Sequence, residues 1–394
     1  MIKAPVPPGP ALAVAVFAAI AAGLWVSAPH AGEVAVPASL AELGERLFFD
    51  VNLSRNRTQS CATCHDPERA FADPRGAASI GDDGLSVGDR NAPTASYASF
   101  VPDFAADEDG FWTGGLFHDA RAATLEAQDA APPLNPTEMA MPDKASVAER
   151  LRADPGYAKA FPAIFGPSVL DDPGAAFDAM TRAIAAFERE PQFAPFSSKY
   201  DRMLRGEAEF TRQEELGRLL FFSQQFTNCN SCHQLRQSAI DPQETFSDYR
   251  YYNLGVPENH DLRERNGITE PDEGLARNPG AAGTPASVGR YRTPTLRNVA
   301  VTGPYMHNGV FEDLRTVILF YNTYNTRNPA RRINPETGAP FGPPEVGRNI
   351  EMDTLTEGPA LDDQRIDALV AFLCTLTDER YEDLLDQPCA SPSR

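Results

Sequence analysis

Two stretches decide how this chain is interpreted: Cys61-Ala62-Thr63-Cys64-His65 and its counterpart Cys229-Asn230-Ser231-Cys232-His233. In an exported chain, Cys-x-x-Cys-His is the attachment site of c-type haem: both thiols add to the vinyl groups, and the histidine reaches the iron. A zinc site needs four ligands, and the other two cysteines lie far away, at positions 374 and 389. A redox dithiol would sit in a βαβ pattern, which the sequence lacks. We therefore predict two covalently bound haem c groups, with His65 and His233 as proximal iron ligands.

The same helical pattern precedes both motifs. Residues 43–49 read LGERLFF and residues 216–222 read LGRLLFF, so each segment places Leu and Phe on one face of a helix. This internal repeat indicates two related domains. We expect a mainly α fold of two cytochrome c-like helical domains joined at an interface, with residues 32–205 holding the first haem, residues 206–378 the second, and a tail at 379–394.

Two further helices follow from capping and periodicity. Asp172 can cap a helix that starts at Pro173, and a second helix is expected over residues 362–376. Their apolar stripes are Phe177, Met180, Ile184 and Phe187 in the first helix and Ile366, Leu369, Val370 and Leu373 in the second. Residues 257–289 and 323–360 are polar and rich in Gly and Pro, so we expect long loops there.

The N-terminus has the pattern of an export signal. Lys3 precedes an uncharged apolar run from Ala11 to Val26, and small residues follow it up to Ala31. The run is shorter than the ~20 residues that span a bilayer comfortably. Residues 1–31 are therefore predicted to be a signal peptide or, if uncleaved, a membrane anchor. The protein is expected in the periplasm, with membrane contact only through that segment.

Composition narrows the possible partners. The 394 residues carry a formal charge of −20, which opposes binding to nucleic acid, and 23 Phe and 11 Tyr supply enough apolar area for a core.

In an oxidising compartment, Cys374 and Cys389 are expected to form a disulfide, whose loop closure would contribute ~3 kcal/mol to stability.

The sixth iron ligand separates an electron carrier from an enzyme, because a catalyst needs an open axial position. Outside the export segment the histidines are His65, His118, His233, His260 and His307. No His or Met lies between Phe71 and Phe117, where a distal ligand of the first haem would be sought. This absence favours an open first iron and hence catalysis.

Several further segments complete a family pattern. They are Arg90-Asn91-Ala92-Pro93, the run from Asp119 to Gln128, Asn135-Pro136-Thr137-Glu138-Met139, Thr295-Leu296-Arg297-Asn298, and the run from Pro304 to Gly309. With the two haem motifs, these segments make the chain from about Leu43 to Leu376 resemble the bacterial di-haem cytochrome c peroxidases and their MauG relatives.

The resemblance implies that peroxide binds at the first haem beneath a Gln and a Glu ten residues apart, here Gln128 and Glu138, with Pro132 in its expected place. The chemistry agrees with these residue types. Splitting a bound peroxide requires a base that takes a proton from one oxygen and returns it to the other, which a carboxylate can do, whereas an amide orients the peroxide without titrating. The resemblance also implies an interdomain Ca²⁺ held by Asn91 and by the carbonyl groups of Thr302 and Pro304, oxygen ligands that suit this ion.

Within the family, the ligand of the second haem separates two branches. Peroxidases usually have a Met fourteen residues after the His of the Pro-Tyr-x-His-x-Gly segment, whereas MauG has a Tyr. Here that position is Tyr321. A phenolate favours the higher oxidation states of iron, and a thioether raises the reduction potential. The alternative is a tyrosine that only packs in the core.

Two positions depart from the family. Asp82 occupies the region where many members have a distal His that is released from the first haem on reduction. We therefore expect this reduction-controlled ligand to be missing. The family's inter-haem Trp is His118 here, and Trp112 lies six residues earlier. Either residue is a candidate relay, and a buried structural role is the alternative for His118.

Three functions follow from these observations. The first is a periplasmic enzyme that reduces H₂O₂ to water with electrons from a small cytochrome c or cupredoxin. The alternative is a MauG-like enzyme that uses peroxide-generated high-valent iron to oxidise residues of an exported partner protein. A third class, a non-enzymatic di-haem electron carrier or sensor, would require both irons to be six-coordinate.

Overall fold

The computed structural model describes residues 1, 37–235, 238, 240–386 and 389. The predicted export segment, apart from Met1, lies outside these residues. Among the described residues, no helix combines the length and apolar character needed to cross a membrane.

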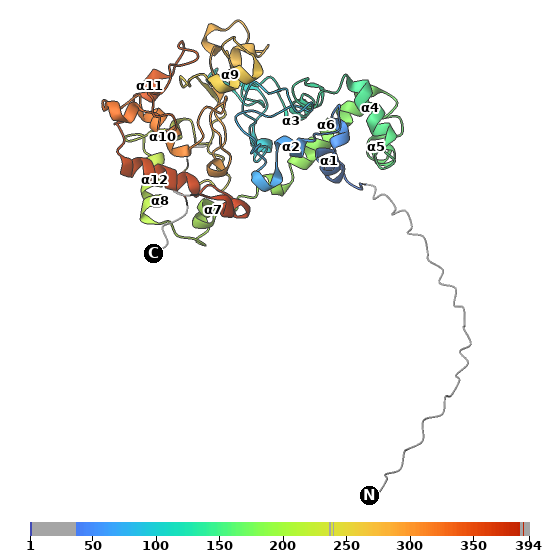
Figure 1. The fold of residues 1–394 in the computed structure, drawn as a ribbon, viewed down its shortest axis with the longest axis horizontal. Coiled ribbons are helices and arrows are strands. Elements are labelled where there is room, and N and C mark those ends of the chain that lie inside the picture. The colour runs from blue at the N-terminus through green and yellow to red at the C-terminus, as the bar shows by residue number, and fades with distance from the viewer. Residues whose placement is uncertain (2–36, 236–237, 239, 387–388, 390–394) are drawn as a thin grey trace, which may run out of the picture. The chain divides into compact units, whose positions relative to one another are not determined.

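Helices dominate the part of the chain that the structure describes from residue 37 onward, as Figure 1 shows. The α-helices are α1 (Leu40–Phe48), α2 (Cys61–Cys64), α3 (Leu125–Asp129), α4 (Lys144–Ala153), α5 (Tyr157–Phe165), α6 (Pro173–Glu188), α7 (Lys199–Leu204), α8 (Arg212–Phe221), α9 (His260–Asn266), α10 (Leu314–Asn322), α11 (Met352–Leu355) and α12 (Asp363–Cys374). The strands are β1 (Ala105–Ala106), β2 (Trp112–Thr113), β3 (Tyr251–Tyr252) and β4 (Tyr291–Arg292), which form two antiparallel pairs, β1 with β2 and β3 with β4. The mainly α prediction is confirmed.

The four predicted helices are present. Helices α1 and α8 precede the two Cys-x-x-Cys-His motifs, and α6 and α12 begin after Asp172 and Asp362, whose side chains accept hydrogen bonds from Ala175 N and Arg365 N. The two segments expected to be loops contain short helices as well. One is α9, where the Asn259 side chain accepts a hydrogen bond from Leu262 N and thereby caps the helix.

Two hydrophobic clusters repeat one arrangement. In the first, α1 packs on α6, and Gly44 lies directly against the Ala183 carbonyl. In the second, α8 packs on α12, and Gly217 lies against the Ala368 carbonyl. Figure 1 shows both pairs. A residue without a side chain is needed at each crossing, because a Cβ there would overlap the facing backbone.

Replacing Gly217 with Ala should therefore lower the free energy of unfolding by about 1–3 kcal/mol, since the added methyl forces α8 away from α12. Chemical denaturation measures the loss. Gly347→Ala is the control, because a Cβ there meets no atom within 4 Å, and its effect should stay within about 0.5 kcal/mol. Equal stabilities of the two variants would contradict the close crossing.

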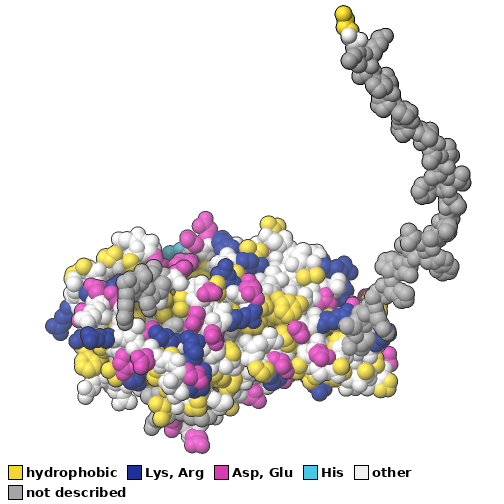
Figure 2. All heavy atoms as spheres, turned by 90° about the horizontal axis from the view of Figure 1, so that it is seen from below, with side chains coloured by type: hydrophobic (Ala, Val, Ile, Leu, Met, Phe, Trp, Pro, Cys, Tyr) yellow, Lys and Arg dark blue, Asp and Glu magenta, His cyan; other side chains and the backbone are white. Residues whose placement is uncertain are grey.

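The disulfide between Cys374 and Cys389 is present and ties the end of α12 to the chain after Leu384. Charged side chains of both signs are interspersed on the face drawn in Figure 2.

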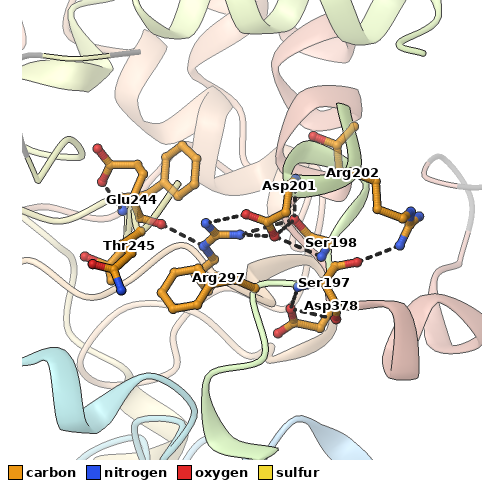
Figure 3. Close-up of polar contacts among 12 residues, drawn as sticks. Ser197, Ser198, Asp201, Arg202, Glu244, Thr245, Arg297 and Asp378 are labelled. Atoms are coloured by element: carbon orange, nitrogen blue, oxygen red, sulfur yellow. Dashed lines mark hydrogen bonds and ion pairs between the residues drawn. The ribbon is translucent and has the colours of Figure 1, made fainter. Parts of the chain in front are cut away.

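A buried polar network is centred on Arg297 and Asp378 (Figure 3). Arg297 is fully buried and forms a two-pronged ion pair with Asp201, with Nη1 2.6 Å from Oδ2 and Nη2 2.9 Å from Oδ1. Asp378, also fully buried, accepts hydrogen bonds from the Tyr97 hydroxyl at 3.0 Å and from Asn298 Nδ2 at 2.9 Å. Because Tyr97 belongs to the N-terminal half and Asn298 to the C-terminal half, the Asp378 carboxylate holds the halves together. The predicted boundary near residue 205 stays a prediction.

Candidate active site

Both Cys-x-x-Cys-His motifs line one cavity of about 480 Å³. The four cysteines of the motifs form no disulfide, and the two histidines lie beside them in the cavity wall. Burial raises the pKa of each of these thiols. The thiols are therefore protonated at neutral pH, and two thiol groups at each motif are available for thioether formation.

The two histidines are held in the same way. His65 Nδ1 donates to the Phe71 carbonyl at 3.2 Å, and His233 Nδ1 donates to the Phe246 carbonyl at 3.0 Å. Both phenylalanines have left-handed backbone, with φ of 53° and 56°, which turns the chain at the accepting carbonyl. A hydrogen bond at Nδ1 fixes the tautomer in which Nε2 carries a lone pair for a metal. The residues at both motifs therefore fit a covalently attached haem c.

The network in Figure 3 supports the second histidine. Arg297 Nε donates to the Glu244 carbonyl at 2.8 Å, and the Thr295 hydroxyl donates to the Thr245 carbonyl at 2.7 Å. These contacts fix the backbone just ahead of Phe246, whose carbonyl orients His233. Arg297 and Asp201 are thus positioning residues that the sequence motifs did not assign.

Gln128 and Glu138 both line the cavity close to the first motif. Gln128 is in α3, and Glu138 follows the short 3₁₀ helix Pro132–Leu134. Asn135 Nδ2 donates to Glu138 Oε1 at 2.8 Å and holds the carboxylate in place. Burial raises the pKa of Glu138 above its usual range, against the opposing effects of Arg121 and Asn135. A raised pKa suits a group that must both accept and return a proton near neutral pH.

Tyr321, in α10, lies in the cavity wall beside the second motif. Within the described residues its hydroxyl has no hydrogen-bond partner. Burial raises the pKa of Tyr321, and the nearby Cys232 and Cys229 thiols raise it further. The side chain is thus a neutral phenol by itself, and a cation beside it would be needed to hold it as phenolate.

The residues predicted for calcium also come together. Asn91, Thr302 and Pro304 all line the same cavity, and Asn91 N donates to the His307 carbonyl at 2.8 Å. The donor set is neutral oxygen, and no group of three His, Cys, Asp or Glu suited to a metal occurs among the described residues.

The structure separates His118 from Trp112. His118 lines the cavity and donates from Nε2 to the Asn91 carbonyl at 3.0 Å. Burial, with Arg90 nearby, lowers the pKa of His118 to about 3, so the ring is neutral. Trp112 stacks on Phe104 in another apolar cluster and is absent from the cavity wall. Of the two candidate relays, His118 is the one placed at the cavity.

Asp82 does not reach the cavity wall. Its carboxylate is buried and accepts hydrogen bonds from Asn56 N at 2.7 Å and from the Thr58 hydroxyl at 2.6 Å. Asp82 therefore fixes the loop ahead of the first motif.

Comparison with known proteins agrees with this geometry. Residues 38–209 match the model of the family described as di-haem cytochrome c peroxidase. The methylamine utilization protein MauG of Paracoccus denitrificans is 54% identical over 381 residues, which cover 94% of this chain and 97% of that protein. The chain belongs to the di-haem cytochrome c peroxidase family. Its members include cytochrome c551 peroxidase of Nitrosomonas europaea, 32% identical over 69% of each chain.

A solved di-haem peroxidase has the same fold. The diheme peroxidase BthA of Burkholderia thailandensis superposes with a TM-score of 0.79 at 35% identity, covering 90% of each chain. The predicted family, the mainly α cytochrome c-like fold and the two haem c groups are thereby confirmed, and the chain is an oxidoreductase that acts on peroxide.

Proposed function

We propose that this di-haem enzyme is MauG-like and uses hydrogen peroxide to oxidise side chains of an exported partner protein. The observation that carries the proposal is Tyr321 in the cavity wall beside Cys229 and Cys232, where the peroxidase branch has Met. The 54% identity to MauG over nearly the whole chain supports the same branch. The predicted periplasmic location is part of this proposal.

The haems would be held by thioether bonds to Cys61, Cys64, Cys229 and Cys232, with His65 and His233 as proximal ligands. When bound, they supply the redox centres that accept the oxidising equivalents of peroxide. The overall reduction is H₂O₂ + 2 e⁻ + 2 H⁺ → 2 H₂O, and the two electrons would come from the partner protein. Ca²⁺ would be bound by neutral oxygens of Asn91, Thr302 and Pro304. Because Asn91 belongs to the N-terminal half and the other two residues to the C-terminal half, the ion would hold the two halves together.

Each protein group has a defined task at the first site. Glu138 takes one proton from the peroxide at a carboxylate oxygen and returns it to the departing oxygen. Asn135, bound to Oε1 at 2.8 Å, keeps that carboxylate from rotating away. Gln128 orients the peroxide through its amide, which cannot titrate and so does not compete for the proton.

At the second site, the Tyr321 hydroxyl would be the protein group that holds the iron together with His233. A hard oxygen ligand stabilises the oxidised metal, whereas a thioether stabilises the reduced metal. The tyrosine therefore favours storing oxidising equivalents at this site over delivering electrons from a donor.

Tyr321→Met should raise the reduction potential of the second haem by a substantial part of the ~0.8 V range that axial ligands span. Spectroelectrochemistry of the holoenzyme measures the shift. Tyr324→Met is the matched control, because Tyr324 lies one turn on, is not part of the cavity wall, and its hydroxyl donates to the Leu254 carbonyl. An unchanged potential in Tyr321→Met would remove Tyr321 from the coordination sphere.

The function itself is tested by co-expressing the enzyme with exported proteins of its source and adding peroxide. We expect a covalent mass change in one partner, seen by mass spectrometry and absent with Glu138→Gln. Rapid peroxide-dependent oxidation of a reduced small cytochrome c or cupredoxin, with every exported protein unmodified, would assign the peroxidase branch instead.

A further inference from the structure

A pair of buried carboxyl groups lies beside the first motif and has no task in the mechanism above. Asp129 is the last residue of α3, and Glu188 is the last residue of α6, which packs on α3. Their exposed fractions are 6% and 4%, and both line the cavity with Cys61 and Gln128. Oδ2 of Asp129 has no hydrogen-bond partner among the described residues.

The charges around the pair are unbalanced. The groups that face it are Cys61 from α2, Glu126 from α3, and Arg189, which follows α6. Arg189 Nη1 is 2.7 Å from Glu126 Oε1, and both side chains are more than a third exposed. Among the residues that the structure describes, Arg189 is the cation that acts on the pair, and it is already paired with Glu126 at the surface.

Burial raises the pKa of Asp129 and of Glu188 above the usual carboxyl range, and the negative charge of Glu188 raises that of Asp129 further. Ionising both of these buried carboxyl groups costs free energy, because the two negative charges repel each other at low dielectric. A proton on one of the two carboxyl groups would remove one of these buried charges.

We propose that Asp129 and Glu188 share one exchangeable proton and form a proton-uptake site coupled to the redox state of the first haem. When one electron enters at the first-haem site from an external reductant, the pair binds one proton from solvent. When the electron leaves, that proton is released. Charge and atoms balance, and the buried cavity gains no net charge.

The sign of the pH dependence follows from linkage. An added electron favours the protonated pair, so the pair's pKa is higher when the first haem is reduced than when it is oxidised. In the pH window between those two values, the equilibrium constant for reduction should fall up to tenfold per pH unit. Below and above the window it should not change with pH.

The test is a redox titration of the holoenzyme at several pH values, followed by absorption and electron paramagnetic resonance signals that separate the two haems. We expect the pH dependence in the unmodified protein and in Asp178→Asn, an exposed change on the same helix α6. We expect it to vanish in Asp129→Asn and in Glu188→Gln. The proposal would be overturned if the reduction potential of the first haem did not change with pH, or if its pH dependence remained in both variants.

Redox-difference infrared spectroscopy of the unmodified protein decides the matter if neither variant assembles with both haems. A protonated-carboxyl band that grows on reduction supports the pair, and an unchanged carboxyl region refutes it. This inference depends on the first haem alone and holds whether electrons come from a partner protein or a small cytochrome, so its failure would leave the MauG-like proposal standing.

Discussion

Glu138→Gln should leave both haems attached and lower peroxide-dependent turnover by about 10²-fold or more. The amide has the size of the carboxyl group and still accepts the hydrogen bond from Asn135 Nδ2, so the local structure is retained. It cannot take a proton from peroxide. Steady-state kinetics with matched haem content measure the loss.

The pH profile gives an independent check on Glu138. Because burial holds its pKa above the usual range, the fraction of carboxylate rises as pH rises through that raised value. Turnover should rise with it, and this limb should be missing in Glu138→Gln. Glu149→Gln, an exposed change on α4, should behave as the unmodified enzyme does. Unchanged turnover in Glu138→Gln would exclude the residue from the chemistry.

Asp201→Ala should lower the free energy of unfolding by about 3–5 kcal/mol, because it leaves the fully buried Arg297 guanidinium without its counter-ion. The change should also disturb the absorption of the second haem, since Arg297 fixes the Glu244 carbonyl two residues before the one that orients His233. Denaturant unfolding followed at both haem and protein signals measures the two effects.

A matched control separates burial from charge. Asp363 pairs with Arg315 and Arg331, but its side chain is 65% exposed, so Asp363→Ala should cost no more than about 1 kcal/mol. Asp201→Ala combined with Arg297→Met should recover part of the loss, because no lone charge stays buried. Equal costs at Asp201 and Asp363 would contradict the role assigned to the buried pair.

Local signals in the sequence predicted much of the fold. The caps at Asp172 and Asp362 and the apolar stripes of α6 and α12 depend on neighbours a few residues away, and the structure confirms them. The repeated helices before the two motifs are confirmed for the same reason. Capping also explains the error at residues 257–289, where Asn259 starts a short helix inside an expected loop.

Long-range pairs could not be predicted in this way. Arg297 meets Asp201 across 96 positions, and Asp129 and Glu188 reach the same cavity only because α3 packs on α6. No spacing rule brings such residues together. His118 and Trp112 were equivalent as sequence candidates, and only the fold places His118 at the cavity.

The roles of Gln128, Glu138, Tyr321 and the calcium ligands came from the family resemblance. The structure brings all of these residues to one cavity, and their chemistry stays a prediction for the variants above.

One measurement tests the MauG-like account most directly: adding stoichiometric H₂O₂ to the purified, fully oxidised holoenzyme and following its Soret band. We expect a rapid change without prior reduction, because an open first site would bind peroxide directly and Tyr321 on the second iron would favour its oxidised state. A reaction that begins only after one-electron reduction would contradict it and would assign a gated peroxidase without Tyr321 on the second iron.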